Sequence, residues 1–169
     1  MEGQALLVTG AYGTGKTTVI EELAQRLEDA ALAYGAIDLD WLMWFESGLD
    51  KDSQRQILLA NLQTVATNYV NAGATRLLLA GAIADQTTLD GIRKALPMPL
   101  HVVRLILPLT RIESRMGEAV TTGRANDKRA AAAWLAAATG VGLEDITFTN
   151  DRPIGDTTDA VAQWMGWPV

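Results

Sequence analysis

The sequence predicts an α/β fold, a three-layer αβα sandwich in which helices cover both faces of a parallel sheet. Short apolar runs alternate along the chain with longer segments of helical periodicity, the order expected of parallel strands joined by helical crossovers. The 169 residues suit one domain, and 49% of them are hydrophobic, enough for one sizeable core. We therefore expect a single domain over residues 1–169.

The N-terminal half alternates two short apolar runs with three segments of helical character. We expect strands at residues 5–9 and 36–39 and helices at residues 16–31, 41–45 and about 53–71. Gly10 bounds the first strand, and apolar residues at intervals of three or four define the first and third helices. Either Asp52 or Ser53 is expected to cap the third helix, and Gly73 ends it.

The C-terminal half continues the alternation. We expect strands at residues 76–83, 101–107 and 146–149, helices at residues 87–96 and 156–167, and two helices within residues 110–139. Pro97 stops one helix and Pro108 ends one strand, because proline lacks the N–H group that both elements need. A glycine-containing break near residues 121–123 separates the two paired helices.

Composition narrows the class of protein. Fourteen basic and twenty acidic residues give a net charge of −6, and there is no Lys/Arg run, which argues against nucleic acid as the partner. The absence of cysteine excludes disulfides and thiolate chemistry. The chain has neither a signal-peptide pattern at its start nor an apolar run long enough to cross a membrane. We expect a cytoplasmic protein without a membrane partner.

The segment from Gly10 to Thr18 follows the first strand and opens the first helix. It contains Gly, four residues, then Gly-Lys-Thr, the Walker A pattern of a phosphate-binding loop. Glycines allow the loop to turn its N–H groups inward around phosphates, and the helix dipole adds positive potential. A plain glycine-rich turn would not need the Lys-Thr pair. The expected nucleotide-binding residues here are Gly10, Ala11, Tyr12, Gly13, Thr14, Gly15, Lys16, Thr17 and Thr18.

Two carboxylates, Asp38 and Asp40, end the second strand and point to the same side of an extended chain. In a parallel sheet this strand end faces the phosphate loop. One carboxylate can hold Mg²⁺ and the other can accept a proton from an attacking hydroxyl. We expect Thr17 and Asp38 on the metal side. The alternatives are a solvated strand end for Asp38 and a helix cap at Trp41 for Asp40.

With these motifs, the sequence resembles the small-molecule and nucleoside monophosphate kinase group of P-loop NTPase-fold proteins. Shikimate kinase, gluconate kinase, adenylylsulfate kinase and chloramphenicol phosphotransferase belong to this group. The resemblance rests on residues 10–18, 38–40, 111–129 and 149–153. It implies a five-stranded parallel sheet of order 2-3-1-4-5, a short helical lid over about residues 111–129, and transfer of the ATP γ-phosphate to a bound acceptor.

Four arginines cluster after the fourth strand, at positions 111, 115, 124 and 129. Arginine can stabilise the charge of a transferring phosphoryl group with paired hydrogen bonds. Arg115 and Arg124 are the candidates, because they flank the break where a lid would bend; Arg115 would also contact the nucleotide. The alternative is a surface helix in which Glu113, Glu118 and Asp127 pair with these arginines.

The third strand departs from motor-type ATPases, since no aspartate directly follows its apolar run. Asp85 lies further on, and a helix cap is the favoured role for it over a contact with substrate. The resemblance makes Asn150 and Arg152 part of the adenine-side loop, although a plain proline turn is the alternative. The guanine-reading Asn-Lys-x-Asp pattern is not found, which favours ATP over GTP.

The acceptor of the phosphate should lie between Asp40 and the helices that follow the second strand. Trp41, Trp44 and Phe45 share a helix face there and could line a pocket, but a role in the core is favoured. His101 is assigned a structural role.

The sequence thus predicts an ATP-dependent, Mg²⁺-assisted kinase for a small hydroxyl-bearing molecule. Its expected catalytic residues are Lys16, Asp38, Asp40, Arg115 and Arg124, and which aspartate is the base stays open. The alternatives are a nucleotide-dependent switch or NTPase that acts on a protein partner, and a nucleotide-binding module without turnover.

Overall fold

The computed structural model of this protein describes residues 3–46, 48–117 and 122–168. The strands are β1 (Gln4–Thr9), β2 (Tyr34–Asp38), β3 (Arg76–Ala80), β4 (Leu100–Ile106) and β5 (Ile146–Thr149). The helices are α1 (Lys16–Asp29), α2 (Lys51–Asn71), α3 (Gln86–Ala95), α4 (Leu109–Met116), α5 (Thr122–Ala136) and α6 (Ile154–Met165), with one 3₁₀ turn, η1 (Trp41–Met43). None of these helices is both long and apolar enough to cross a membrane.

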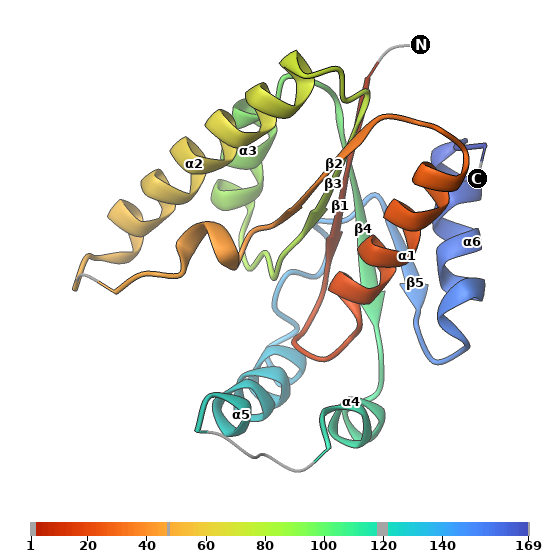
Figure 1. Cartoon of the computed structure of the whole chain (residues 1–169). Helices are drawn as coiled ribbons and strands as arrows, with labels where there is room; N and C mark the ends of the chain where they lie inside the picture. The colour runs from red at the N-terminus through yellow and green to blue at the C-terminus, as the bar shows by residue number, and fades with distance from the viewer. Residues whose placement is uncertain (1–2, 47, 118–121, 169) are drawn as a thin grey trace.

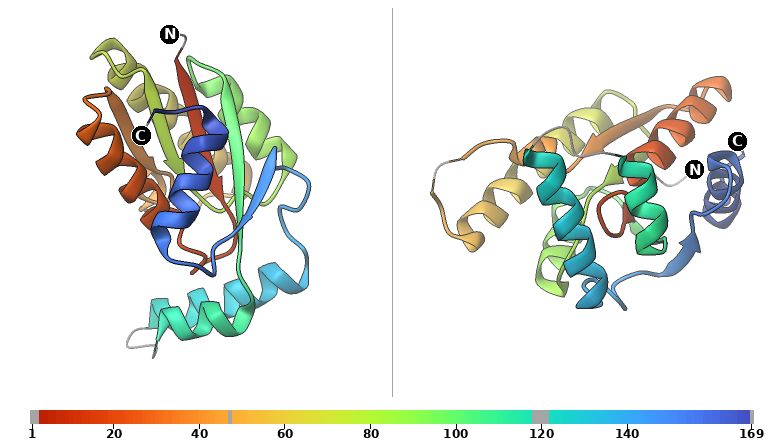
Figure 2. Two further views of the ribbon diagram at one scale, coloured as in Figure 1. Left: turned by 90° about the vertical axis from the view of Figure 1, so that its right-hand side faces the viewer. Right: turned by 90° about the horizontal axis from the view of Figure 1, so that it is seen from below.

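The five strands form one parallel sheet of order β2-β3-β1-β4-β5, so the predicted fold class and strand order are confirmed. Helices α2 and α3 cover one face of the sheet, while α1 and α6 cover the other (Figure 1). Helices α4 and α5 lie at the carboxyl ends of the strands, away from both layers (Figures 1 and 2). All loops that follow a strand therefore open at one edge of the sheet.

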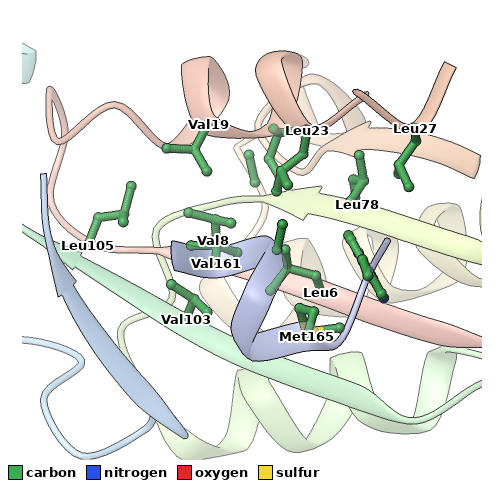
Figure 3. Packing of buried hydrophobic residues seen from close by; sticks show 14 residues of the cluster. Leu6, Val8, Val19, Leu23, Leu27, Leu78, Val103, Leu105, Val161 and Met165 are labelled. Carbon is green, nitrogen blue, oxygen red and sulfur yellow. The ribbon is translucent and has the colours of Figure 1, made fainter. Parts of the chain in front are cut away.

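The alternation of side chains along β1 builds a separate core on each face. Leu6 and Val8 pack with α1 and α6, as Figure 3 shows, whereas Ala5 and Leu7 pack with α2 and α3. All four are fully buried. A central strand that is apolar on both faces is expected where helices cover both sides. Strand β1 is therefore held from both faces, and the loop after it begins from a firmly packed strand.

A third apolar cluster attaches α4 and α5 to the loop after β1. It contains Ala11 from the loop, Leu107, Ile112 from α4 and Ala131 from α5, all of them buried. Seen from the carboxyl edge, this loop lies between α4 and α5 (Figure 2, right). The predicted pair of helices is therefore present, and both helices pack against the phosphate loop. Residues 118–121, which include the start of the predicted break near residues 121–123, lie outside the described residues.

Several boundaries differ from those predicted. Strand β3 ends at Ala80 rather than at residue 83. Gly81, directly after it, lies against Leu39, and a Cβ atom at Gly81 would lie 2.7 Å from the leucine side chain. Helix α2 is capped by Asp50, not by Asp52 or Ser53: Asp50 has extended backbone angles and its carboxylate accepts the Ser53 N–H at 2.8 Å. The predicted helix over residues 41–45 is a single 3₁₀ turn that ends at Met43.

Asp85 caps α3, the role favoured for it from the sequence. Its carboxylate accepts the Thr88 N–H at 2.8 Å and the Thr88 hydroxyl at 3.1 Å. An N-cap carboxylate satisfies a helix N–H group that has no partner within the helix.

Replacing Asp85 by alanine should lower the free energy of unfolding by about 1 kcal/mol, because that N–H loses its acceptor. Asp85→Asn should be nearly neutral, since asparagine caps helices equally well. Urea denaturation followed by circular dichroism measures both variants. Equal stability of Asp85→Ala and the wild type would show that the cap does not stabilise α3.

Candidate functional site

The loop after β1 depends on three glycines in left-handed backbone conformations. Gly10, Gly13 and Gly15 have φ angles of 138°, 77° and 94°. A Cβ atom at Gly10 would lie 2.4 Å from the Leu105 carbonyl oxygen, and one at Gly15 would lie 2.6 Å from the Asn150 amide nitrogen. Side chains are thus excluded both by backbone strain and by space. The glycine pattern seen in the sequence has a direct structural cause.

Helix α1 begins directly at the end of this loop. Its N-cap residue is Gly15, and no side chain caps the helix. The Thr14 hydroxyl donates to the Ala11 carbonyl oxygen at 2.8 Å, which holds the loop in a compact turn. N–H groups of the loop and of the first helical turn, together with the positive end of the helix dipole, suit an anion such as a phosphate.

Lys16 is the charged group of the loop. It is only 8% exposed, and its ammonium donates to the carbonyl oxygens of Gly10 at 3.1 Å and Ala11 at 3.0 Å. Burial lowers the pKa of Lys16, while the charges of Asp40 and Asp38 act in the opposite direction. These carboxylates, together with the carbonyl oxygens, favour an ammonium ion at the mouth of the loop.

The end of β2 brings two carboxylates to the same place. The Asp38 Oδ2 atom accepts a hydrogen bond from the Thr17 hydroxyl at 3.3 Å, and Asp38 Oδ1 accepts the Asp40 N–H at 2.9 Å. Asp38 is therefore directed at the first turn of α1. Burial raises the pKa of Asp40, and Asp38 adds to the rise, while Lys16 opposes it.

A cleft of about 240 Å³ joins these groups; we name it the aspartate cleft. It is lined by Tyr12, Gly13, Gly15, Lys16, Thr17, Thr18, Asp38, Asp40, Ala80 and Gly81. Residues far apart in the sequence meet here because β1, β2 and β3 are neighbours in the sheet and end at the same edge. The cleft is large enough for a phosphate group and a small second molecule beside it.

The charge of Asp127, on α5, acts on this site, whereas from the sequence Asp127 was named only in the alternative of a surface helix with paired charges. Its charge raises the pKa of both Tyr12 and Asp40, in each case after the larger effect of burial. The Tyr12 ring in turn lies 5.3 Å from the Lys16 ammonium. Only the packing of α5 on the loop, through Ala131, brings Asp127 to this side, so no local sequence signal could have identified it.

A second cleft, of about 320 Å³, opens on the other side of the loop; we name it the arginine cleft. It is lined by Gly13, Gly15, Thr18, Arg115, Met116, Asn150 and Ile154. Arg115 is anchored there, because its guanidinium donates to the Asn150 carbonyl oxygen at 2.6 Å. The two clefts share Gly13, Gly15 and Thr18, so one extended ligand can reach from one to the other across the loop.

Asn150 connects the loop after β5 to the phosphate loop. It is 1% exposed, its amide nitrogen donates to the Thr14 carbonyl oxygen at 2.7 Å, and its amide oxygen accepts the Thr157 hydroxyl at 2.8 Å. Both polar atoms of the Asn150 side chain thus have partners within the protein, and the hydrogen bond to Thr14 holds the phosphate loop in place. Thr157, which fixes the orientation of the amide, was not identified from the sequence.

The remaining predicted residues are distributed as follows. Arg152 is exposed and lines a separate hollow between β5 and α6, together with Thr147 and Asp156. The Arg124 side chain lies outside the described residues. Arg111 is directed toward the Asp151 carbonyl oxygen, at 3.5 Å. Among Arg111, Arg115 and Arg129, whose side chains the structure describes, Arg115 is the one that lines the arginine cleft beside the phosphate loop.

The side chains of the aspartate cleft fit a magnesium ion. Mg²⁺ prefers oxygen ligands, keeps several waters and needs only one or two protein groups beside phosphates. The Thr17 hydroxyl and the Asp38 carboxylate supply such oxygens within 3.3 Å of one another. Among the described residues no group of three or more histidine, cysteine or acidic side chains could hold a metal ion alone, so a metal would be shared with a phosphate ligand.

The aromatic residues after Asp40 are exposed, so the favoured role in the core is wrong. Trp41 is 67% exposed, Trp44 76% and Phe45 44%. The reason is the short 3₁₀ turn: Leu42 packs on the core in their place, and the Leu42 carbonyl oxygen accepts the Asn61 amide at 2.9 Å. The two tryptophans lie together on the outer face.

The fold is similar to that of P-loop small-molecule kinases. A sugar kinase from Janibacter superposes with a TM-score of 0.70 at 17% identity, over 98% of this chain and 96% of that one. A gluconokinase from Sinorhizobium meliloti gives 0.63 at 18% identity, over 96% and 95%. An APS kinase from Mycobacterium tuberculosis in complex with AMPPNP and APS gives 0.64 at 19%, over 98% of each chain.

These likenesses establish the fold of the chain and its structural relation to ATP-dependent small-molecule kinases. No protein-family model and no curated protein sequence matches this chain.

Replacing Asn150 by alanine should weaken both the fold and the site. The change leaves the Thr14 carbonyl and the Thr157 hydroxyl without their partner, which costs about 1–3 kcal/mol of stability. Nucleotide affinity should fall as well, because the phosphate loop loses its support. Denaturant titration and binding of a fluorescent ATP analogue measure the two effects, with Asp151→Ala at the exposed neighbour as the control. Unchanged affinity in Asn150→Ala would contradict the supporting role.

Proposed function

We propose that the protein is an ATP-dependent phosphotransferase that moves the γ-phosphate to a hydroxyl group of a small molecule. The observation that carries this proposal is the contact between the Thr17 hydroxyl and the Asp38 carboxylate beside Lys16 and Asp40. This cleft contains oxygens that can bind a metal, an ammonium that can bind phosphates and a carboxylate that can accept a proton. The fold shared with small-molecule kinases supports the same class of reaction.

Lys16 and the N–H groups of the phosphate loop bind the phosphates of ATP. Lys16 can exchange its two carbonyl acceptors for phosphate oxygens without leaving the mouth of the loop. Thr17 and Asp38 would hold Mg²⁺, which neutralises charge on the phosphates when it is bound. Arg115 lies across the arginine cleft, where it can contact the nucleotide beyond the phosphates.

Asp40 is the proposed base. Both oxygens of Asp38 already have partners in Thr17 and in the Asp40 N–H, which leaves Asp40 to face the acceptor. Its raised pKa also makes it a better proton acceptor than an ordinary aspartate. Asp40 takes the proton of the hydroxyl as the acceptor oxygen bonds to the γ-phosphorus. The bond to the bridging oxygen breaks, and ADP leaves with the electron pair.

Asp40→Asn should lower kcat by roughly 10²–10⁴-fold while leaving nucleotide affinity close to that of the wild type, because the amide cannot accept the proton. In the wild type, kcat/KM should fall on the acid side, through a pKa above the usual range of aspartate, since Asp40 must be ionised to act. Steady-state kinetics with an acceptor and titration of a fluorescent ATP analogue measure the two quantities.

The matched control is Asp85→Asn, which keeps the cap of α3 and should leave turnover unchanged. Asp38→Asn should instead weaken the dependence of nucleotide binding on Mg²⁺. If Asp40→Asn retained full kcat with an acceptor, Asp40 would not be the base. Rapid ATP hydrolysis that no acceptor accelerates would favour the alternative, an NTPase or switch, over a kinase.

Asp40→Asn should also raise the melting temperature at neutral pH. A carboxyl whose pKa is higher in the folded than in the unfolded chain contributes most to stability below the unfolded pKa, and that contribution is lost as pH rises through the folded pKa. The ionised Asp40 thus opposes folding at pH 7, and its removal should help by up to a few degrees. Thermal unfolding at pH 7 and below pH 4 tests this: the gain should vanish in acid.

A further inference from the structure

Trp41 and Trp44 form an exposed aromatic pair at the edge of the proposed active site. Their ring centroids lie 4.5 Å apart with the planes tilted by 47°, and both side chains are more than half exposed. Trp41 begins the 3₁₀ turn η1 and Trp44 directly follows its last residue, Met43, so the two rings meet across the turn. Large aromatic side chains so exposed are typical of binding surfaces.

The anchoring of η1 shows that this exposure is built into the fold. Leu42 packs on the core beneath the turn, and Asn61 of α2 donates to its carbonyl oxygen. On the other side, the Asp40 N–H is bonded to Asp38. The turn is thus held by Asp38 and by Asn61, and the two tryptophan side chains do not pack in the core.

The pair begins directly after Asp40, a lining residue of the aspartate cleft. Trp41 follows the proposed base Asp40 directly, and consecutive Cα atoms are about 3.8 Å apart. A molecule whose hydroxyl reaches Asp40 would extend toward this turn. An apolar ring of that molecule would meet the exposed indole rings, whereas a fully hydrated sugar acid would gain little from them.

The charges next to the pair in the sequence argue against an anionic acceptor. Residues 38–52 contain five carboxylates, Asp38, Asp40, Glu46, Asp50 and Asp52, and one basic residue, Lys51. The next basic residue, Arg55, is paired with Asp52 at 2.8 Å. A negatively charged ligand would be repelled here, while indole faces and carboxylates both tolerate or attract a positive charge.

We propose, building on the proposed kinase function, that Trp41 and Trp44 form the specificity surface for the acceptor. The acceptor belongs to the class of hydroxyl compounds that carry an apolar ring and no negative charge. The ring stacks on the tryptophan pair while the hydroxyl is directed at Asp40. The pair is a binding element and takes no part in the transfer of the proton.

Three probes that share a benzyl group and a hydroxyl test the charge preference: 3-phenyl-1,2-propanediol is neutral, phenylalaninol is cationic and phenyllactate is anionic. Glycerol serves as the probe without a ring. Binding is measured by calorimetry on the full chain with an ATP analogue and Mg²⁺. The neutral and cationic ring probes should bind roughly tenfold more tightly than phenyllactate or glycerol. Equal binding of phenyllactate, or no binding of any ring probe at millimolar concentration, would overturn the proposal.

Variants of the pair test its role. Trp41→Ala/Trp44→Ala should lose roughly tenfold or more in affinity for the ring probes, whereas Trp41→Phe/Trp44→Phe should retain most of it. Trp164→Phe, a tryptophan that packs edge-on against His101, is the matched control and should leave affinity unchanged. Because both rings are exposed, the alanine variant should keep the wild-type melting temperature. Full affinity in a folded alanine variant would contradict the assignment.

Two further measurements separate this inference from the function on which it rests. A fluorescent ATP analogue should bind the alanine variant and the wild type equally well. If the analogue binds neither protein, the proposed kinase function fails; if it binds both and the ring probes do not discriminate, only the acceptor class fails. Light scattering completes the test, because a wild-type dimer that the alanine variant converts to a monomer would assign the surface to contact between copies.

Discussion

The site depends on one constraint: the phosphate loop must hold three glycines in left-handed conformations against close neighbours. Gly10 lies against the Leu105 carbonyl of β4, Gly13 against Ile112 of α4, and Gly15 against Asn150 after β5. Each contact comes from a different part of the chain, so neighbours in β4, in α4 and after β5 all leave room for glycine alone. The surroundings of the loop are therefore a product of the complete fold, although its motif is contiguous in sequence.

The sheet order turns that local shape into a two-sided site. Because β1 is central, β3 and β2 lie on one side of it and β4 and β5 on the other. The first side supplies Asp38 and Asp40, and the second supplies Arg115 and Asn150. A nucleotide across the loop would then have its phosphates beside the aspartates and the rest of its structure beside the arginine, which separates phosphate transfer from recognition of the donor.

The sequence was most informative where the residues of a feature are neighbours in one segment whose local conformation places them together. The phosphate loop, the aspartate pair and the strand order follow from such segments and the family they resemble. Contacts set by neighbours could not be predicted: the charge of Asp127 acts on the site only through the packing of α5, and Asn150 contacts Thr14 only because β5 lies beside β4. The tryptophans were assigned to the core because a helix was assumed, whereas a 3₁₀ turn buries Leu42 and turns them outward.

Two features near Asp40 lower the stability of the folded protein, and one ligand could compensate for both. Asp40 holds a proton more tightly in the folded chain, so its ionised form is disfavoured at neutral pH. Trp41 and Trp44 expose apolar surface that could have been buried. Burial and the charge of Asp38 disfavour the ionised form of Asp40, and the packing of Leu42 on the core leaves the two tryptophans exposed. A ligand with a hydroxyl at Asp40 and a ring on the indoles would relieve both, which links base and binding surface in one site.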